Sequence, residues 1–143
     1  MQIWDTRAKQ VAVSLPLATS PPSGSSSGVT ATIAAISSTT PSGGHHIISG
    51  GSDNSVSIVD IRSSSVQASF RHHKVGVYTV ASVGTRTLLT ADGAGLLCCY
   101  DLATAEMTYG LGASSKGAVR CVGVSEKQLF ACGEDGNVLI YDF

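Results

Sequence analysis

Residues 46–60, HIISGGSDNSVSIVD, are the first of three segments that align with one another without a gap. The second segment is TLLTADGAGLLCCYD at 87–101, and the third is QLFACGEDGNVLIYD at 128–142. The segments close at Asp60, Asp101 and Asp142, so both intervals are 41 residues. A fixed period of this length predicts a repeat architecture built from one supersecondary unit.

A fourth copy of the ending, MQIWD, opens the chain and closes at Asp5. Its distance from Asp60 is 55 residues, which exceeds the period by 14. The surplus falls in 19–44, a run of Ser, Thr, Pro and Gly around one apolar island at 29–36. We expect a strand at about 29–36 and lengthened loops on either side of it.

Each repeat consists of short apolar runs separated by turn residues. In the second repeat this pattern predicts strands near 75–83, 87–91, 96–100 and 106–110. Gly and Asn, which tolerate positive φ, follow the second run of each repeat, as at Gly136-Asn137. No segment carries a sustained helical apolar period, so the sequence predicts an all-β fold.

Composition narrows the class of protein further. The chain has 143 residues, 43% hydrophobic and 13% charged, which suits one folded domain rather than a disordered chain. Its net charge of -1 lacks the basic excess of a dedicated nucleic-acid binder, so direct nucleic-acid binding is not expected. The longest apolar runs are too short for a membrane-spanning helix, and no membrane partner is expected.

The period, the four strands per unit and the terminal aromatic-Asp pair resemble the WD-repeat family of β-propellers. Trp4-Asp5 is the literal pair, and Val59, Tyr100 and Tyr141 stand at the aromatic position before the other aspartates. In this family the four strands of a blade are lettered a to d in chain order. The resemblance implies an incomplete propeller arc of three blades plus the c and d strands of a preceding blade. The implied segments are 1–18 (the c-d strands), 19–44 (the insertion), 29–70 (blade 1), 71–112 (blade 2) and 113–143 (blade 3, ending at strand c).

Such an arc does not close, because propellers use about four to eight blades. We therefore expect the chain to be the C-terminal half of a longer protein. The alternative is that another WD-repeat chain completes the ring.

The resemblance also implies a buried hydrogen-bond network of His, Ser/Thr, Asp and Trp in each blade. No blade has the full set. The second blade has Ala94 at the Asp position, with Asp92 two residues earlier as a substitute. The network residues carried over in this way are Ser49 and Asp53 in blade 1, His73, Thr90, Asp92 and Tyr100 in blade 2, and Asp135 and Tyr141 in blade 3.

A catalytic triad could be assembled from Ser49, His73 and Asp92, but the structural network explains all three and no G-x-S-x-G elbow is present. We therefore expect no enzyme activity and no cofactor. The pairs His45-His46 and His72-His73 lack a completing ligand set, so no metal site is expected. The four cysteines show no C-x-x-C spacing and are interpreted as buried free thiols in a reducing compartment.

Two groups of residues are candidates for partner binding. In a propeller, the connections between blades (d–a) share one face of the disc with the b–c hairpins within blades. Here the d–a connections carry basic residues and the b–c hairpins carry acidic ones, so the face has mixed charge. Such a face suits a protein partner, or is simply a set of solvated loops. This first group is Arg71, His72, Lys74, Arg120 and Glu134.

The second group is the arginine pair Arg7 and Arg62, which complete the sequences W-D-x-R at 4–7 and D-x-R at 60–62. Consecutive D-x-R boxes resemble the motif with which WD-repeat substrate receptors dock the damage-binding adaptor of cullin-type ubiquitin ligases. The alternative is that Asp and Arg pair with each other within each turn. The next blade reads Tyr100-Asp101-Leu102-Ala103 and lacks the arginine.

These observations predict a non-catalytic protein–protein interaction scaffold in an intracellular complex, cytoplasmic or nuclear. Its most specific form is a substrate receptor of a cullin-type ubiquitin ligase. The alternative is a constitutive structural subunit of a ribonucleoprotein, trafficking or cytoskeletal assembly. Fold alone does not decide between them.

Overall fold

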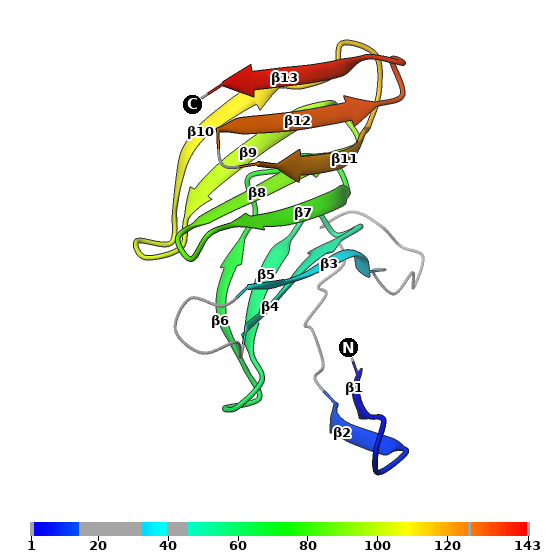
Figure 1. The fold of residues 1–143 in the computed structure, drawn as a ribbon, viewed down its shortest axis with the longest axis vertical. Helices are drawn as coiled ribbons and strands as arrows, with labels where there is room; N and C mark the ends of the chain where they lie inside the picture. The colour runs from blue at the N-terminus through cyan, green and yellow to red at the C-terminus, as the bar shows by residue number, and fades with distance from the viewer. Residues whose placement is uncertain (1, 15–32, 40–45, 126, 143) are drawn as a thin grey trace.

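The computed structural model describes residues 2–14, 33–39, 46–125 and 127–142 (Figure 1). Every regular element in these ranges is a β-strand. Within them there is no helix with the length and hydropathy needed to cross a membrane.

The strands form four antiparallel sheets in which sequence neighbours pair. The N-terminal sheet has two strands, β1 (Gln2–Asp5) and β2 (Gln10–Ser14). The first four-stranded sheet contains β3 (Ile33–Thr39), β4 (His46–Gly51), β5 (Val56–Asp60) and β6 (Ser65–Phe70). The second contains β7 (Val77–Val83), β8 (Thr87–Asp92), β9 (Leu96–Asp101) and β10 (Glu106–Gly112). The last sheet has three strands, β11 (Val119–Val124), β12 (Gln128–Gly133) and β13 (Val138–Asp142).

The strands expected in the second repeat are found as β7–β10, with bounds within two residues of the expected ones. The strand expected at about 29–36 is β3, which starts at Ile33 and continues to Thr39. It extends into the polar sequence Ser37-Ser38-Thr39 because these residues pair with β4, up to Thr39 opposite His46. Backbone pairing does not require apolar side chains. Residues 29–32 and the rest of the 19–44 insertion lie outside the described ranges.

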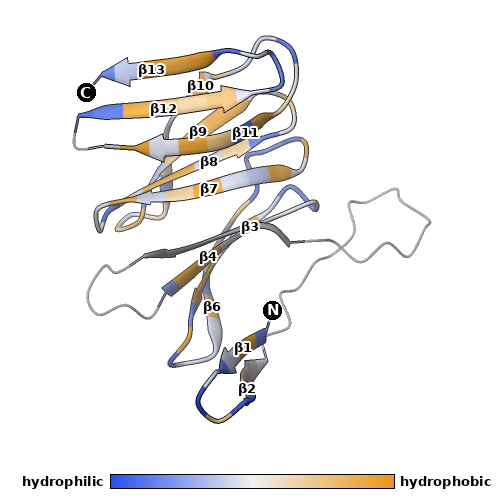
Figure 2. Cartoon of the chain, turned by 45° about the vertical axis from the view of Figure 1, so that its right-hand side comes forward, coloured by the Kyte–Doolittle hydropathy of each residue, from blue (hydrophilic) through white to orange (hydrophobic). Residues whose placement is uncertain are grey.

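The second sheet (β7–β10) is the centre of the molecule, because apolar residues cover both of its faces. On one face Leu88, Cys98 and Tyr100 pack with residues of the first sheet such as Ile48 and Val56. On the other face Leu89, Leu97 and Cys99 pack with residues of the last sheet such as Leu129 and Val119. Figure 2 shows β8 and β9 hydrophobic along most of their length, whereas the turns are mostly hydrophilic.

Gly95 fixes the connection between the second sheet and the last one. Its carbonyl accepts hydrogen bonds from the amides of Ala113 (2.8 Å) and Ser114 (3.2 Å). Its φ is +88°, and a Cβ placed there would lie 2.4 Å from the carbonyl oxygen of Ser114. Only glycine lets these two backbone segments approach so closely.

We predict that Gly95→Ala lowers the free energy of unfolding by about 2–4 kcal/mol, because it adds a steric clash to an unfavourable φ. Gly136→Ala is the matched control. Gly136 also has a positive φ, +75°, but no atom lies within 4 Å of its Cβ position. It should cost only about 1 kcal/mol. Urea denaturation of both variants checks this, and equal losses would contradict the steric explanation.

Candidate protein-interaction site

A buried hydrogen-bond network joins His73 to the second sheet. The Nδ1 atom of His73 lies 2.8 Å from Oδ2 of Asp92, and its Nε2 atom lies 2.6 Å from Oγ1 of Thr90. All three side chains are buried. The other carboxylate oxygen of Asp92 accepts hydrogen bonds from the amides of Ala94 (2.9 Å) and Leu96 (3.0 Å). Asp92 therefore links the segment before β7 to the turn between β8 and β9.

This arrangement does not assemble Ser49, His73 and Asp92 into a triad. Both imidazole nitrogens of His73 have partners, and Thr90 is fully buried. Ser49 is not one of those partners. A nucleophile must reach its substrate and be hydrogen-bonded to its base, and neither candidate hydroxyl does both. The network therefore positions a loop rather than a reacting group.

The remaining network candidates are not joined in this way. Ser49 and Asp53 are buried, but Asp53 accepts hydrogen bonds from the amide (3.2 Å) and hydroxyl (2.7 Å) of Ser55. The other carboxylate oxygen of Asp53 is buried and has no partner among the described residues. Within the described residues, the first sheet shows no counterpart of the link that His73 gives the second.

The two tyrosines expected in the blade networks, Tyr100 and Tyr141, do not hydrogen-bond to His73. Tyr100 is buried, its hydroxyl has no hydrogen-bond partner within the described ranges, and burial raises its pKa. Tyr141 donates to the carbonyl of Gly112 at 3.3 Å and so ties the last sheet to β10.

Asp135, the last of the network candidates, accepts hydrogen bonds from the amides of Asn137 (3.1 Å) and Ser115 (3.3 Å). The Asn137 amide lowers the pKa of Asp135.

Residues 106–142 match the family described as WD domain, G-beta repeat. The matched segment runs from β10 through β13. Residues 106–142 therefore carry a WD repeat. The four antiparallel sheets of the chain are consistent with a partial WD-repeat propeller, and we call the second sheet (β7–β10) blade 2 and the last (β11–β13) blade 3. No curated protein matches the chain. Members of the WD-repeat family generally act as non-catalytic scaffolds that bind other proteins.

At one end of the blades, which we call the loop end (52–55, 71–76, 93–95, 113–118 and 134–137), two bulged residues meet. The pairing register shifts at Tyr78 in β7 and at Arg120 in β11. A bulge redirects its extra side chain. The guanidinium of Arg120 lies 4.3 Å from the ring centroid of Tyr78, a cation–π contact between neighbouring blades.

Glu134 extends this contact. It binds Arg120 in an ion pair and accepts a hydrogen bond from the amide of Ala118 at 3.2 Å. The guanidinium of Arg120 holds the pKa of Glu134 below its ordinary value. Two partner-binding candidates, Arg120 and Glu134, are therefore brought together, along with Tyr78, which the sequence did not single out.

The other candidates of this end remain exposed and separate. Arg71, His72 and Lys74 are exposed, and the ion pairs of the described residues include neither Arg71 nor Lys74. The His72 ring lies 5.6 Å from the Tyr100 ring. Asn54 donates its side-chain amide to the carbonyl of Lys74 at 2.9 Å, which fixes the backbone of this basic segment against the first blade.

At the opposite end, three of the four closing aspartates cap the c–d turns, which are the turns β1–β2, β5–β6 and β9–β10. Asp5, Asp60 and Asp101 each accept a hydrogen bond at 2.8 Å from the amide two residues later. This Asx turn satisfies the aspartate without using an arginine side chain. The amide of Arg62 lowers the pKa of Asp60.

The arginine side chains of these turns are therefore largely available. Arg7 is 94% exposed, with its Nε atom 3.8 Å from Asp5. Arg62 is exposed and takes part in none of the ion pairs of the described residues. In the third of these turns, β9–β10, Asp101 is paired with an arginine from elsewhere. Arg86 of the β7–β8 turn places its terminal nitrogen 2.8 Å from Oδ2 of Asp101.

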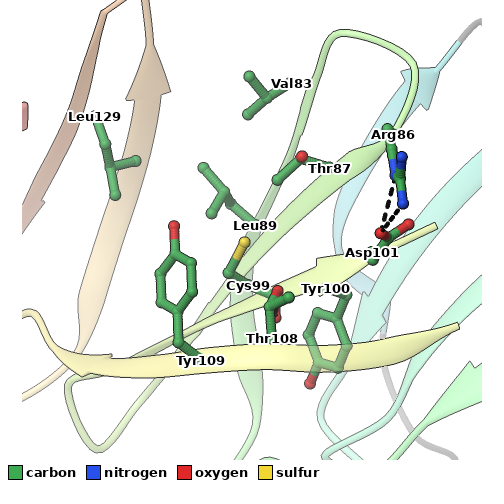
Figure 3. Close-up of a pocket in the computed structure, with 10 residues that line it drawn as sticks. All are labelled: Val83, Arg86, Thr87, Leu89, Cys99, Tyr100, Asp101, Thr108, Tyr109 and Leu129. Atoms are coloured by element: carbon green, nitrogen blue, oxygen red, sulfur yellow. Dashed lines mark hydrogen bonds and ion pairs between the residues drawn. The ribbon is translucent and has the colours of Figure 1, made fainter. Parts of the chain in front are cut away.

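A cavity of about 250 Å³ opens beside this third turn, between blade 2 and Leu129 of β12 (Figure 3). Its walls include Val83, Leu89 and Tyr109, and the Arg86–Asp101 ion pair lies at one side. A hydrogen bond with the Cys99 thiol, together with burial, raises the pKa of Tyr109 to about 12. The cavity has room for one aromatic or large aliphatic side chain.

In the described part of the chain, no three His, Cys, Asp or Glu side chains are grouped to hold an ion. Sequence reasoning missed Tyr78, Arg86 and the cavity. Tyr78 and Arg120 are each the bulged residue near the start of the first strand of their blade, so they occupy equivalent positions in successive blades.

We predict that His73→Ala lowers the free energy of unfolding by about 2–4 kcal/mol, since it leaves Asp92 and Thr90 buried without their shared partner. His72→Ala removes the same ring from the next position, where the side chain is exposed, and should cost less than about 1 kcal/mol. Urea denaturation measures both. Similar losses would show that the buried network does not stabilise the blade.

We predict that Arg120→Ala raises the pKa of Glu134, because it removes the cation that favours the ionised carboxylate. Titration of the Glu134 carboxyl by NMR checks this. Arg86→Ala serves as the control: it should raise the pKa of Asp101, which Arg86 lowers, and leave Glu134 unchanged. An unchanged Glu134 titration in Arg120→Ala would contradict the ion pair.

Proposed function

We propose that this WD-repeat chain is a substrate receptor of a cullin-type ubiquitin ligase within an intracellular complex, and that it docks on the ligase adaptor with Arg7 and Arg62. The ligase performs the chemistry, and the chain presents the substrate. The observation that carries the proposal is that Asp5 and Asp60 are satisfied by backbone amides, which leaves both arginine side chains for a partner.

The availability of these side chains weighs against the alternative role of the D-x-R boxes as internal pairs. Arg62 makes no ion pair with the described residues, and the 3.8 Å separation of Arg7 from Asp5 is at the long end of ion-pair distances. A guanidinium in solvent offers a planar set of donors to partner carboxylates or carbonyls. Figures 1 and 2 both place the β1–β2 sheet at the same lower end of the molecule as the β5–β6 turn.

The third turn supports the same docking face by other means. Its D-x-R box is incomplete, but Arg86 supplies a guanidinium from the neighbouring turn and is 68% exposed. The cavity beside it is lined largely by apolar side chains. A partner segment with acidic groups and one apolar anchor would match these features, since interfaces concentrate their energy in buried anchors.

The loop end is left for the presented substrate. There, Tyr78 and Val75 are exposed apolar side chains, and Arg71 and Lys74, which form no ion pair with the described residues, add positive charge. Binding adaptor and substrate at opposite ends of the blades would allow both to be held at once.

We predict that the double variant Arg7→Ala/Arg62→Ala weakens binding to the purified cullin-ligase adaptor by at least about tenfold, because two charge-assisted contacts are lost. Calorimetry or biolayer interferometry measures the affinity. The control is Arg71→Ala/Lys74→Ala, which removes the same charge from the loop end and should leave adaptor binding unchanged.

Circular dichroism and urea denaturation establish that both variants are folded. A wild-type chain that does not bind the adaptor, or a turn variant that binds it as well as wild type, would overturn the receptor proposal. The constitutive structural subunit would then be the better explanation of the same fold.

A further inference from the structure

The turn between β5 and β6 carries three consecutive serines directly after an exposed arginine. Its sequence is Arg62-Ser63-Ser64-Ser65, and these three are the serines of the chain that follow an arginine within three positions. Arg62, Ser63 and Ser64 are exposed, whereas Ser65 is partly buried. Figure 1 shows this turn at the lower end of the first sheet, away from the faces on which the sheets pack. Its exposure therefore does not depend on whether further blades lie beside the described ones.

The hydroxyls of Ser63 and Ser65 are engaged within the hairpin. Their oxygen atoms are 2.7 Å apart, so one hydroxyl donates to the other. The side-chain amide of Gln67 donates to both, at 3.1 Å to Ser65 and at 3.4 Å to Ser63. Both hydroxyl oxygens are thereby committed to neighbours in the same hairpin.

Ser64 differs from these two serines in its contacts and its backbone. Its hydroxyl oxygen lies 3.5 Å from the carbonyl oxygen of Ile61, which is longer than the ~2.5–3.0 Å of an ordinary O–H···O hydrogen bond. Its φ is +52°, in the left-handed region. The equivalent residues of the other two c–d turns, Lys9 and Ala105, have φ values of +52° and +58°. The left-handed position is therefore a regular part of these turns, and of the three it is the β5–β6 turn that places a hydroxyl there.

Arg62 is available to a phosphate at this position. Its backbone amide donates to Asp60 at 2.8 Å, and its side chain takes part in none of the ion pairs of the described residues. A serine phosphate carries a charge of about −1.5 to −2 at neutral pH and accepts charge-assisted hydrogen bonds from a guanidinium. A phosphate on Ser64, two residues away, would therefore occupy Arg62 and make the charge of the turn negative.

We propose that Ser64 is a phosphorylation site for an arginine-directed protein serine kinase, and that its phosphate binds Arg62 and withdraws this side chain from a partner. The Ser64 oxygen attacks the γ-phosphorus of ATP, the bond between that phosphorus and the β–γ bridging oxygen breaks, and ADP leaves. The hydroxyl proton passes to the catalytic carboxylate of the kinase.

The consequence for docking rests on the proposed function. Arg62 is one of the two arginines assigned to the ligase adaptor. A phosphate that binds Arg62 removes a donor and adds negative charge where an acidic partner segment would lie, so the two surfaces repel each other. Phosphorylation of Ser64 thus releases the chain from the adaptor. The turn of Arg7 has Lys9 at the equivalent position and offers no such control.

Phosphate mapping tests the site on the full 143-residue chain. The folded chain is incubated with ATP and the catalytic subunit of cyclic-AMP-dependent protein kinase, which selects serines that follow arginine, and is digested with trypsin. We expect a single phosphate in peptide 63–71, located on Ser64 by the fragment masses. Ser64→Ala should lower the initial rate of incorporation at least about tenfold, and the matched control Ser63→Ala by less than about twofold. Phosphate mainly on Ser63 or Ser65, or none in this peptide, would overturn the site.

Phosphorus NMR tests the contact with Arg62 without any adaptor. Phosphoserine is placed at position 64 during translation, in the wild-type chain and in Arg62→Gln. The pKa of the phosphate should be lower in the wild-type chain, because the guanidinium favours the doubly ionised form. Equal pKa values in the two chains would overturn the pairing of the phosphate with Arg62.

Adaptor affinity separates the regulation from the proposed function. The chain with phosphoserine at position 64 should bind the purified adaptor at least about tenfold more weakly than the unmodified chain. Ser64→Ala treated with the kinase should bind as tightly as untreated wild type. Equal affinities of the modified and unmodified chains would overturn the regulation and leave the receptor proposal standing. An unmodified chain that does not bind the adaptor would overturn the receptor proposal, and the mapping and the phosphate titration would then decide the site by themselves.

Discussion

The burial of blade 2 on both faces is the constraint on which the rest of the structure depends. Leu88 and Leu89 are adjacent in β8 and point to opposite sides, and Cys98 and Cys99 do the same in β9. A sheet that is apolar on both faces is stable only when it is covered twice. The first blade and blade 3 supply these covers, so the order of blades along the chain is also their order in space. Turns and loops are left at the two ends, where they are free to bind partners.

The two ends of the blades use their charged residues differently. At the turn end, Asp5 and Asp60 accept hydrogen bonds from backbone amides, and the side chains of Arg7 and Arg62 are exposed, whereas Arg86 pairs with Asp101. At the loop end, Arg120 is held between Glu134 and Tyr78, while Arg71 and Lys74 form no ion pair with the described residues. A residue engaged by its own chain contributes shape, whereas an unpaired one contributes charge for recognition. This difference is the physical basis for assigning separate partners to the two ends.

The repeat pattern in the sequence was sufficient to predict the all-β fold, the WD-repeat family and the strands of blade 2, because apolar alternation and turn residues are local signals. The substitute role considered for Asp92 matches its hydrogen bond to His73. Contacts that depend on strand register were not predictable in the same way. The meeting of Tyr78 with Arg120 requires a bulge in each strand. The approach of Arg86 to Asp101 depends on two turns that are 15 residues apart in the chain.

The bulges at Tyr78 and Arg120 have a consequence for how such a protein can change over generations. Because one side chain comes from blade 2 and the other from blade 3, neither position can be optimised alone. The effect of a substitution at Tyr78 therefore depends on whether Arg120 is present. Such non-additivity is expected for residues in direct contact. The contact is therefore inherited by a pair of adjacent blades. Grafting a single blade onto another propeller would transfer its strands without transferring this contact.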